Sequence, residues 1–423
     1  MEVFYSRCAG LDVHKKKVTV CVLIGEGGQR PSKQIRTFST MWDDLQQLSS
    51  WLKGEGVTHV AMESTGVYWQ PIWNALEGSF ELLLVNAHHI KTVPGRKTDV
   101  KDSEWIADLL RHGLLKGSFV PAREQRELRE LTRYRTSLLQ EKSAEVNRLQ
   151  KTLEGANIKL ASVVTDVMGA SGREMLAALV AGTTDPTVLV ELARGKLRDK
   201  QPELQRALAG RFREHHRFLV AQQLAHIDDL DHLIAELDRE IAERLRPFEE
   251  TISRLDAIPG IGRRIAEILI AEIGTDMSRF PTSAHLASWA GMCPGNNESA
   301  GKRHSGKTRK GNSYLRVVLT EAANAAARKK GSYLAAQFRR LAKRRGGKRA
   351  ALAVGHSILV IAYHLLAHAD RPYEDLGYTY FDRRDRDIIE RRLVKRLEQL
   401  GNRVTLEKVG LAQPSAPSTL VAA

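Results

Sequence analysis

The hydrophobic positions in the first quarter of the chain follow the two-residue period of β-strands. Residues 9–24 form two strand-like halves joined by the basic stretch Lys15–Lys17, and β-branched residues alternate with other types in the second half. Two further strands are predicted at residues 58–64 and 80–86, and two helices at residues 42–52 and 69–76. Strands that alternate with helices indicate a mixed α/β sheet.

The pattern becomes helical beyond residue 99. Residues 124–153 and 212–245 carry apolar side chains at roughly heptad spacing, so we expect these helices to pair as an antiparallel coiled coil or with a second chain. Shorter helices are expected between them, with a turn at Gly182–Pro186. The sequence therefore predicts an α/β domain followed by all-α regions, with boundaries at 1–122, 123–250 and 251–400, and a disordered tail at 401–423.

Composition excludes several classes of protein. A hydrophobic content of 42% is ordinary for a globular chain. The three cysteines, Cys8, Cys21 and Cys293, form no CxxC pair, which fits small buried thiols in a reducing cytoplasm and argues against a disulfide framework or a zinc knuckle. We find no apolar run long enough to cross a bilayer, so no membrane partner is expected.

The positive charge is concentrated in one stretch of the chain. Residues 302–349 hold sixteen lysines or arginines and a single acid, Glu321, which accounts for the whole net charge of +15. A solvated charged face is one interpretation of such a run. Binding to the phosphate backbone of nucleic acid is the better one, because clustered cations release counterions from the polyanion.

Four acidic residues occupy unusual positions. Asp12 lies inside an apolar strand and Glu63 ends another, while Asp99 and Asp102 begin a helix with a spacing that puts both on one face. Each alone is explained by a strand end or a helix cap. Together they predict a site for Mg²⁺ or Mn²⁺, which prefer oxygen ligands and support phosphoryl transfer.

Residues 289–316 are glycine-rich, basic and almost free of periodicity, which is typical of a flexible phosphate-binding loop. The hydroxyls here belong to Ser299, Ser305, Thr308 and Ser313, and the residue pattern does not select a nucleophile among them. The cations that would stabilise a pentavalent phosphorus and contact nucleic acid are Lys302, Arg303, Lys307, Arg309, Lys310 and Arg316.

Pro259–Gly262 joins two predicted helices in the manner of a helix-hairpin-helix element. Gly260 and Gly262 would let the turn approach a phosphate, and the next helix would present its N–H groups to it. A tight turn between helices without any ligand explains the same residues equally well.

Three segments carry a resemblance to a known family. LDVHKK (11–16), AMESTGVYW (61–69) and GRKTDVKDSEWIADLL (95–110) resemble the acidic motifs of the DEDD transposases of the IS110 type. The resemblance implies a RuvC-like (RNase H-like) N-terminal domain, with the metal-binding quartet on Asp12, Glu63, Asp99 and Asp102. It covers most of the chain and is weak in the helical middle.

The C-terminal half is similar to the same family through PGNNESA (294–300). The resemblance assigns the catalytic serine to Ser299, which would form a covalent phosphoserine with DNA. Ala300 stands where the family commonly has glycine, and Ser305, which precedes Gly306, is the rival nucleophile.

The resemblance implies an insertion-sequence transposase that acts on donor and target DNA. It also implies guidance by a bridge RNA and a homo-oligomer, either a dimer or a tetramer. Two other functions fit parts of the sequence. A RuvC-like junction-resolving nuclease would use the four acids with water as the nucleophile, and a non-enzymatic nucleic-acid-binding protein would need only the basic segment.

Overall fold

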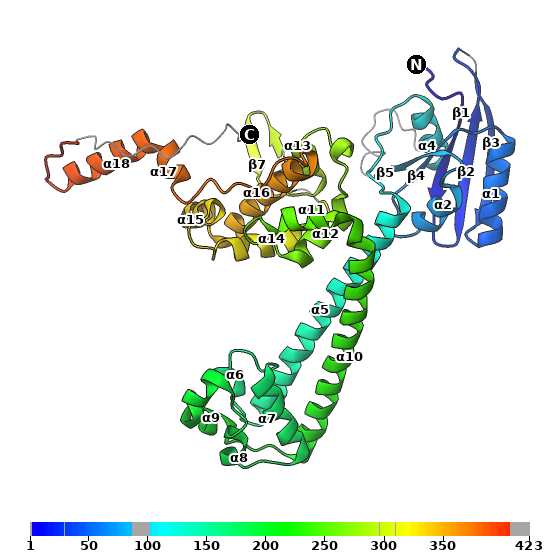
Figure 1. Ribbon diagram of the computed structural model, residues 1–423. Coiled ribbons are helices and arrows are strands. Elements are labelled where there is room, and N and C mark those ends of the chain that lie inside the picture. Colours follow the sequence, from blue (N-terminus) through cyan, green and yellow to red (C-terminus); the bar gives the residue numbers. More distant parts are fainter. Residues whose placement is uncertain (1, 29, 87–101, 296, 309, 407–423) are drawn as a thin grey trace. The chain divides into compact units, whose positions relative to one another are not determined.

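The computed structural model describes all residues except 1, 29, 87–101, 296, 309 and 407–423. The chain forms two compact units, Met1–Ala122 and Arg123–Ala423 (Figure 1). Asp99 and most of the predicted disordered tail fall outside the described residues.

Unit 1 is built on a five-stranded sheet with the order β3-β2-β1-β4-β5. The strands are β1 (Arg7–Val13), β2 (Lys17–Ile24), β3 (Ser32–Ser39), β4 (His59–Glu63) and β5 (Glu81–Val85). β2 pairs antiparallel with both β1 and β3, whereas β4 pairs parallel with β1 and with β5. The prediction of a mixed sheet is confirmed.

β3 is the strand that the hydrophobic pattern did not predict. It lies at the edge of the sheet, and its sequence SKQIRTFS contains only two apolar residues, Ile35 and Phe38. Charged side chains such as Lys33 and Arg36 are common on edge strands, where they hinder pairing with another chain. A strand of this kind resembles a polar loop in the sequence.

Helices cover both faces of the sheet. α1 (Trp42–Gly54) and α2 (Trp69–Leu76) pack on one face, and α4 (Asp102–Arg111) packs on the other. Cys8 and Cys21 are buried beneath α4, and this burial raises the pKa of each thiol to about 12, so both remain protonated. Cys293 is partly exposed, so burial of the thiols is confirmed for two of the three cysteines.

Unit 2 begins with two long helices that lie side by side (Figure 1). α5 (Arg123–Gly155) pairs with α10 (Glu214–Leu245) within the same chain, and Leu138 packs against Leu230 and Ile234. Short helices join their far ends and enclose a core of their own. These are α6 (Leu160–Val163), α7 (Ala170–Ala181), α8 (Pro186–Val190), η1 (Gly195–Lys200) and α9 (Gln201–Leu208).

The rest of unit 2 is a helical bundle interrupted by one hairpin. Its helices are η2 (Arg246–Phe248), α11 (Glu249–Asp256), α12 (Arg263–Ile273), η3 (Met277–Arg279), α13 (Ser283–Trp289), α14 (Ser313–Ala326), α15 (Tyr333–Arg345), α16 (Gly347–Ala367), α17 (Tyr380–Arg384) and α18 (Arg386–Gln399). The hairpin consists of β6 (Asn297–Ser299) and β7 (Lys302–Ser305). The predicted turn at Pro259–Gly262 lies between α11 and α12.

One described helix, α16, is long and apolar enough to cross a membrane by length and composition. The expectation that no apolar run reaches this length is therefore wrong. The reason is its place in the fold, because α16 packs against α13, α14 and α15 and contributes Val354, Ile358 and Ala362 to the core. A helix that is buried in a bundle has the same composition as a membrane span.

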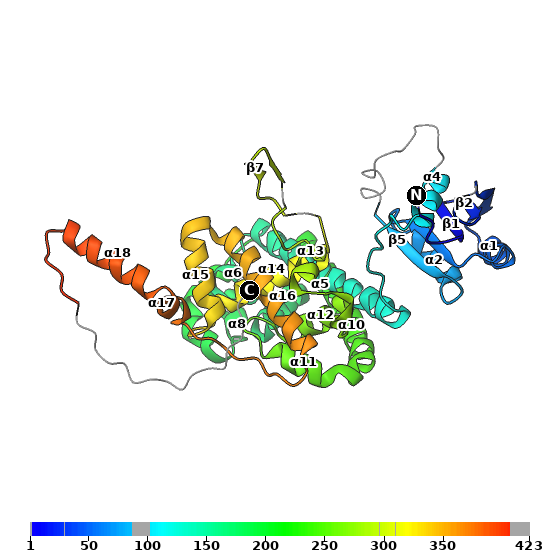
Figure 2. The same ribbon diagram turned by 90° about the horizontal axis from the view of Figure 1, so that it is seen from above.

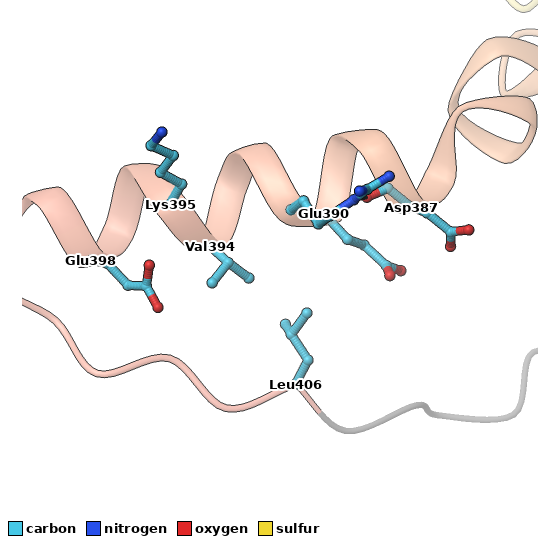
Figure 3. Close-up of a pocket in the computed structure, with 7 residues that line it drawn as sticks. Asp387, Glu390, Val394, Lys395, Glu398 and Leu406 are labelled. Atoms are coloured by element: carbon cyan, nitrogen blue, oxygen red, sulfur yellow. Dashed lines mark hydrogen bonds between the residues drawn. The ribbon is translucent and has the colours of Figure 1, made fainter.

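α17 and α18 extend beyond the bundle (Figures 1 and 2). α18 has no buried residue, and a shallow pocket runs along it between Glu390, Val394 and Leu406 (Figure 3). None of the predicted site residues lines this pocket.

Candidate active site

Asp12 and Glu63 lie at equivalent positions on two neighbouring parallel strands. The register pairs Leu11 of β1 with Met62 of β4, and each acid is the next residue along its strand. Alternate residues of a strand point to opposite faces. Cys8 on β1 and Ala61 on β4 belong to the cluster beneath α4, so Asp12 and Glu63 project from that same face.

α4 brings a third acid to this edge of the sheet. Its last residue, Arg111, accepts hydrogen bonds from the backbone N–H groups of Phe4 (2.9 Å) and Tyr5 (3.2 Å), which precede β1. One turn earlier in α4, the backbone of Ala107 lies over Gly10 of β1. α4 therefore runs antiparallel to β1, and its first residue, Asp102, lies toward the end of β1 that carries Asp12.

Gly10 is required for this close approach. A Cβ atom at this position would lie 2.3 Å from the Ala107 backbone nitrogen and 2.4 Å from the Ser103 carbonyl oxygen. Real contacts are never this short, so any larger residue must push α4 away from β1. Such a shift would also move Asp102 relative to Asp12.

We therefore expect Gly10→Ala to destabilise unit 1 by about 3 kcal/mol, the usual cost of overpacking a tight core. Urea unfolding of the full chain and hydrogen exchange of the α4 amides would measure the effect. Gly27→Ala is the matched control in the same unit, because no atom lies within 4 Å of a Cβ placed there. Wild-type exchange of α4 in Gly10→Ala would contradict the assigned role.

His14 was not singled out by the sequence, although it contacts the candidate site. Its Nε2 atom lies 3.1 Å from Oδ2 of Asp12, and the Asp12 side chain is one quarter exposed. The spacing of two residues was the available signal, because residues two apart share one face of a strand. The contact gives Asp12 a neighbour that can donate a hydrogen bond or a proton.

The predicted quartet is only partly described. Asp99 falls outside the described residues. Among the residues that are described, no three histidine, cysteine or acidic side chains gather closely enough to hold a metal ion. Asp12, Glu63 and Asp102 carry carboxylate oxygens, the type of ligand that Mg²⁺ and Mn²⁺ prefer.

The predicted flexible loop at 289–316 contains a β-hairpin, so the expectation of an irregular segment is corrected. Ser299 pairs with Lys302, and the two residues between them, Ala300 and Gly301, form the turn with φ values of 49° and 70°. Positive φ at both positions is the geometry of a tight two-residue hairpin turn, which suits glycine and costs energy for alanine. Figure 2 shows the hairpin projecting from the helices of unit 2.

The two rival serines occupy different ends of this hairpin. Ser299 is the last residue of β6, directly before the turn, whereas Ser305 ends β7 and pairs with Asn297. A backbone hydrogen bond of 2.9 Å from Gly295 to Lys307 closes the stem below them. Ser299 is thus at the tip of the projection and Ser305 is nearer its base.

The cations of the basic stretch lie on the hairpin, on three helices and on the connection between α14 and α15, which carries Arg328, Lys329 and Lys330. Lys302 and Arg303 belong to β7, Lys307 and Lys310 follow it, and Arg316 lies in the first turns of α14. Arg309 falls outside the described residues. Most of the remainder are exposed on α15 and at the start of α16, and those on α15 include Lys343, Arg344 and Arg345.

The two glycines of the predicted helix-hairpin-helix element have different surroundings. Gly260 has a φ of 91°, and a Cβ there would lie 2.1 Å from the Ala322 carbonyl oxygen of α14. Helix packing alone therefore requires glycine at this position. Gly262 is exposed directly before α12, so the predicted phosphate contact stays a proposal that the N-terminus of this helix would carry.

Two family models match ranges of the chain that contain the acidic motifs and the serine segment. Residues 9–158 match the IS110 DEDD family model, described as a transposase, and residues 252–339 match the model described as the transposase IS116/IS110/IS902 family. Together the two models cover more than half of the chain. The chain belongs to the IS110 family of transposases.

Individual relatives of this IS110-family chain agree with the assignment. A probable family 20 transposase of Pseudomonas aeruginosa is 26% identical over 273 residues, which are 64% of this chain and 71% of the relative. An insertion element IS110 uncharacterized 43.6 kDa protein of Streptomyces coelicolor is 39% identical over 66 residues, 15% of this chain and 16% of the relative.

Proposed function

We propose that this IS110-family chain cleaves and rejoins DNA strands, using metal-bound carboxylates in unit 1 and a serine nucleophile in unit 2. The observation that carries the proposal is the shared register of Asp12 and Glu63 on parallel strands, with α4 bringing Asp102 to the same edge of the sheet. Asp12 and Glu63 are only partly exposed, and a partly buried carboxylate is costly unless it has a partner. A divalent ion would supply such a partner to acids on neighbouring strands.

The carboxylates of Asp12, Glu63, Asp99 and Asp102 would hold Mg²⁺ or Mn²⁺. When bound, these ions supply charge that stabilises the attacking and leaving oxygens of a phosphoryl transfer. His14 beside Asp12 would hold that carboxylate in orientation. The mixed sheet supports the proposed RuvC-like fold of this unit.

Ser299 would act as the nucleophile. Its Oγ loses a proton and forms a bond to phosphorus, while the bond from phosphorus to one deoxyribose oxygen breaks and that oxygen takes up a proton. The product is a phosphoserine ester with the DNA. In the rejoining step a strand hydroxyl attacks the same phosphorus and releases the serine, so no oxidant or energy source is needed.

The chain would act together with DNA, with a bridge RNA and with further copies of itself. Lys302, Arg303, Lys307 and Lys310 would contact the DNA backbone near the serine, with the exposed cations of α15 and α16 adding to the surface. A bridge RNA would select donor and target by base pairing, which leaves the protein to recognise backbone and shape. The α5–α10 arm, interpreted as a coiled coil, would help to assemble a dimer or tetramer.

The direct test is cleavage and joining of the element's own end DNA by the purified protein. We expect strand cleavage with Mg²⁺ or Mn²⁺ and none after chelation by EDTA, with activity recovered when the ion is restored. RNA that copurifies should be sequenced, because a discrete structured RNA encoded beside the gene supports guidance. Binding without any cleavage would favour the non-enzymatic alternative, whereas cleavage that persists fully in EDTA would exclude metal-bound carboxylates.

A further inference from the structure

One buried carboxylate binds the residues at the base of the β6–β7 hairpin, which carries Ser299 and is called the serine hairpin here. Glu272, in the last turn of α12, is completely buried. Its carboxylate accepts two hydrogen bonds from the Arg133 guanidinium of α5, at 2.7 and 2.8 Å, and one of 2.6 Å from the Asn312 amide. Asn312 is the N-cap of α14, and its Oδ1 accepts a bond of 3.1 Å from the Leu315 backbone N–H.

The two flanks of the hairpin segment meet at this carboxylate. A Cβ on Gly311 would lie 2.4 Å from the backbone nitrogen of Gly291, so the chain closes tightly just before Asn312. On the outgoing side, the Arg133 guanidinium lies 4.4 Å over the Tyr314 ring. On the incoming side, the Arg129 guanidinium lies 5.8 Å from the centre of the Trp289 ring.

Arg129 and Arg133 both belong to the beginning of α5. The Arg129 guanidinium also donates to the carbonyl oxygens of Ala271 and Glu272 and makes an ion pair of 3.5 Å with the Glu272 carboxylate. Burial lowers the pKa of Arg129 to about 10, and the charge of Glu272 opposes this shift. α5 starts at Arg123, the residue that follows Ala122 of unit 1 in the chain.

We propose that Glu272 and Asn312 are positioning residues that fix the serine hairpin to the first turns of α5. Three charged or amide side chains share one buried carboxylate, so a rotation of α5 must move the hairpin base with it or break these bonds. The direction of the hairpin is thereby fixed relative to α5. In the sequence, this helix begins directly after the last residue of unit 1. This inference rests on the proposed role of Ser299 in catalysis.

Asn312→Asp tests the link without removing the helix cap. Aspartate caps a helix as well as asparagine, so the bond to Leu315 is kept. It replaces the amide donor that faces Glu272 with a second carboxylate, which repels it. The double variant Glu272→Gln/Asn312→Asp restores a donor–acceptor pair between the two positions in reversed order and keeps the total charge. It gives up the bond from Arg133 Nη2, because that group and Asn312 donate to the same oxygen of Glu272.

Glu267→Gln is the matched control. Glu267 also lies buried on α12 and accepts a hydrogen bond of 2.7 Å from Arg135 of α5, so its loss weakens the same pair of helices. Its other partner is Arg263 of α12 itself. This variant should lower the melting temperature about as much as Asn312→Asp does.

The readouts are an SDS-stable protein–DNA adduct and hydrogen exchange of peptides from 291–311 in the full chain. In Asn312→Asp we expect adduct formation to fall by about 100-fold, the effect of misplacing a reacting group by an ångström, with DNA affinity unchanged. Exchange in the hairpin peptides should rise. The double variant should recover part of both losses relative to Asn312→Asp, whereas Glu267→Gln should show neither loss.

Equal behaviour of Asn312→Asp and Glu267→Gln in both readouts would overturn the positioning role. The absence of any recovery in the double variant relative to Asn312→Asp would do so as well, because the losses would then not arise from the pairing of residues 272 and 312. Failure of the proposed function is distinguishable from these results. It would appear as a wild-type protein that forms no adduct, while hydrogen exchange would still report on the hairpin.

Discussion

Replacing Asp12 with Asn is expected to reduce DNA cleavage by about a thousandfold or more while leaving the fold intact, the scale of loss seen when a charge-stabilising group is removed from a phosphoryl or acyl transfer site. The amide keeps the size of the side chain and can still contact His14. It removes the negative charge that a divalent ion needs in its ligand. Glu63→Gln should have an effect of similar size, because Glu63 holds the equivalent place on β4.

The matched control for these variants is Asp108→Asn. Asp108 lies on α4, as Asp102 does, but its exposed carboxylate is 3.5 Å from His112 near the other end of the helix. We expect this variant to cleave at the wild-type rate. Cleavage should be measured under single-turnover conditions on a labelled end substrate, with circular dichroism confirming the fold. Full cleavage by Asp12→Asn would exclude the carboxylate mechanism.

The sequence predicts that Asp12 and Glu63 belong to one site, but it does not predict which residues each acid lies beside. Both acids sit in or at the end of apolar strands, which marked them as unusual and put them in the predicted site. What the pattern lacked was the register, since a shift of one residue would place them on opposite faces of the sheet. The register depends on long-range contacts such as the fit of α4 over Gly10, which no local pattern encodes.

The segments predicted least well share a physical cause. β3 and the β6–β7 hairpin consist largely of polar residues, and neither has the apolar alternation that marks a half-buried strand. Their backbone pairing comes from neighbouring strands and tight turns, and the turn at Ala300–Gly301 lacks the Asn-Gly signal that usually announces a hairpin. The burial of Glu272 was not predicted either, because a glutamate in an amphipathic helix is normally expected on its solvent-exposed face.

Ser299→Ala is expected to abolish the covalent protein–DNA adduct completely, whereas Ser305→Ala should retain it. The two serines make an internally matched pair, since they lie on opposite strands of one hairpin and differ in their place along it. Removing a nucleophile leaves no alternative route to a phosphoserine ester. The adduct is measured on denaturing gels with labelled DNA, and its attachment site by mass spectrometry of the digested product.

The result of Ser299→Ala also separates a transposase from a nuclease that uses water. A water nucleophile would be activated in unit 1 alone, so strand cleavage would continue in Ser299→Ala at the wild-type rate with no adduct in either protein. A serine nucleophile requires cleavage and adduct to be lost together. The turn residue makes this test sharper, because Ala300→Gly removes a side chain from a residue with a φ of 49° and stabilises the hairpin tip without touching a hydroxyl. Adduct formation that is kept or increased in Ala300→Gly but lost in Ser299→Ala would place the chemistry on the serine itself, because the hairpin conformation is then the same or better.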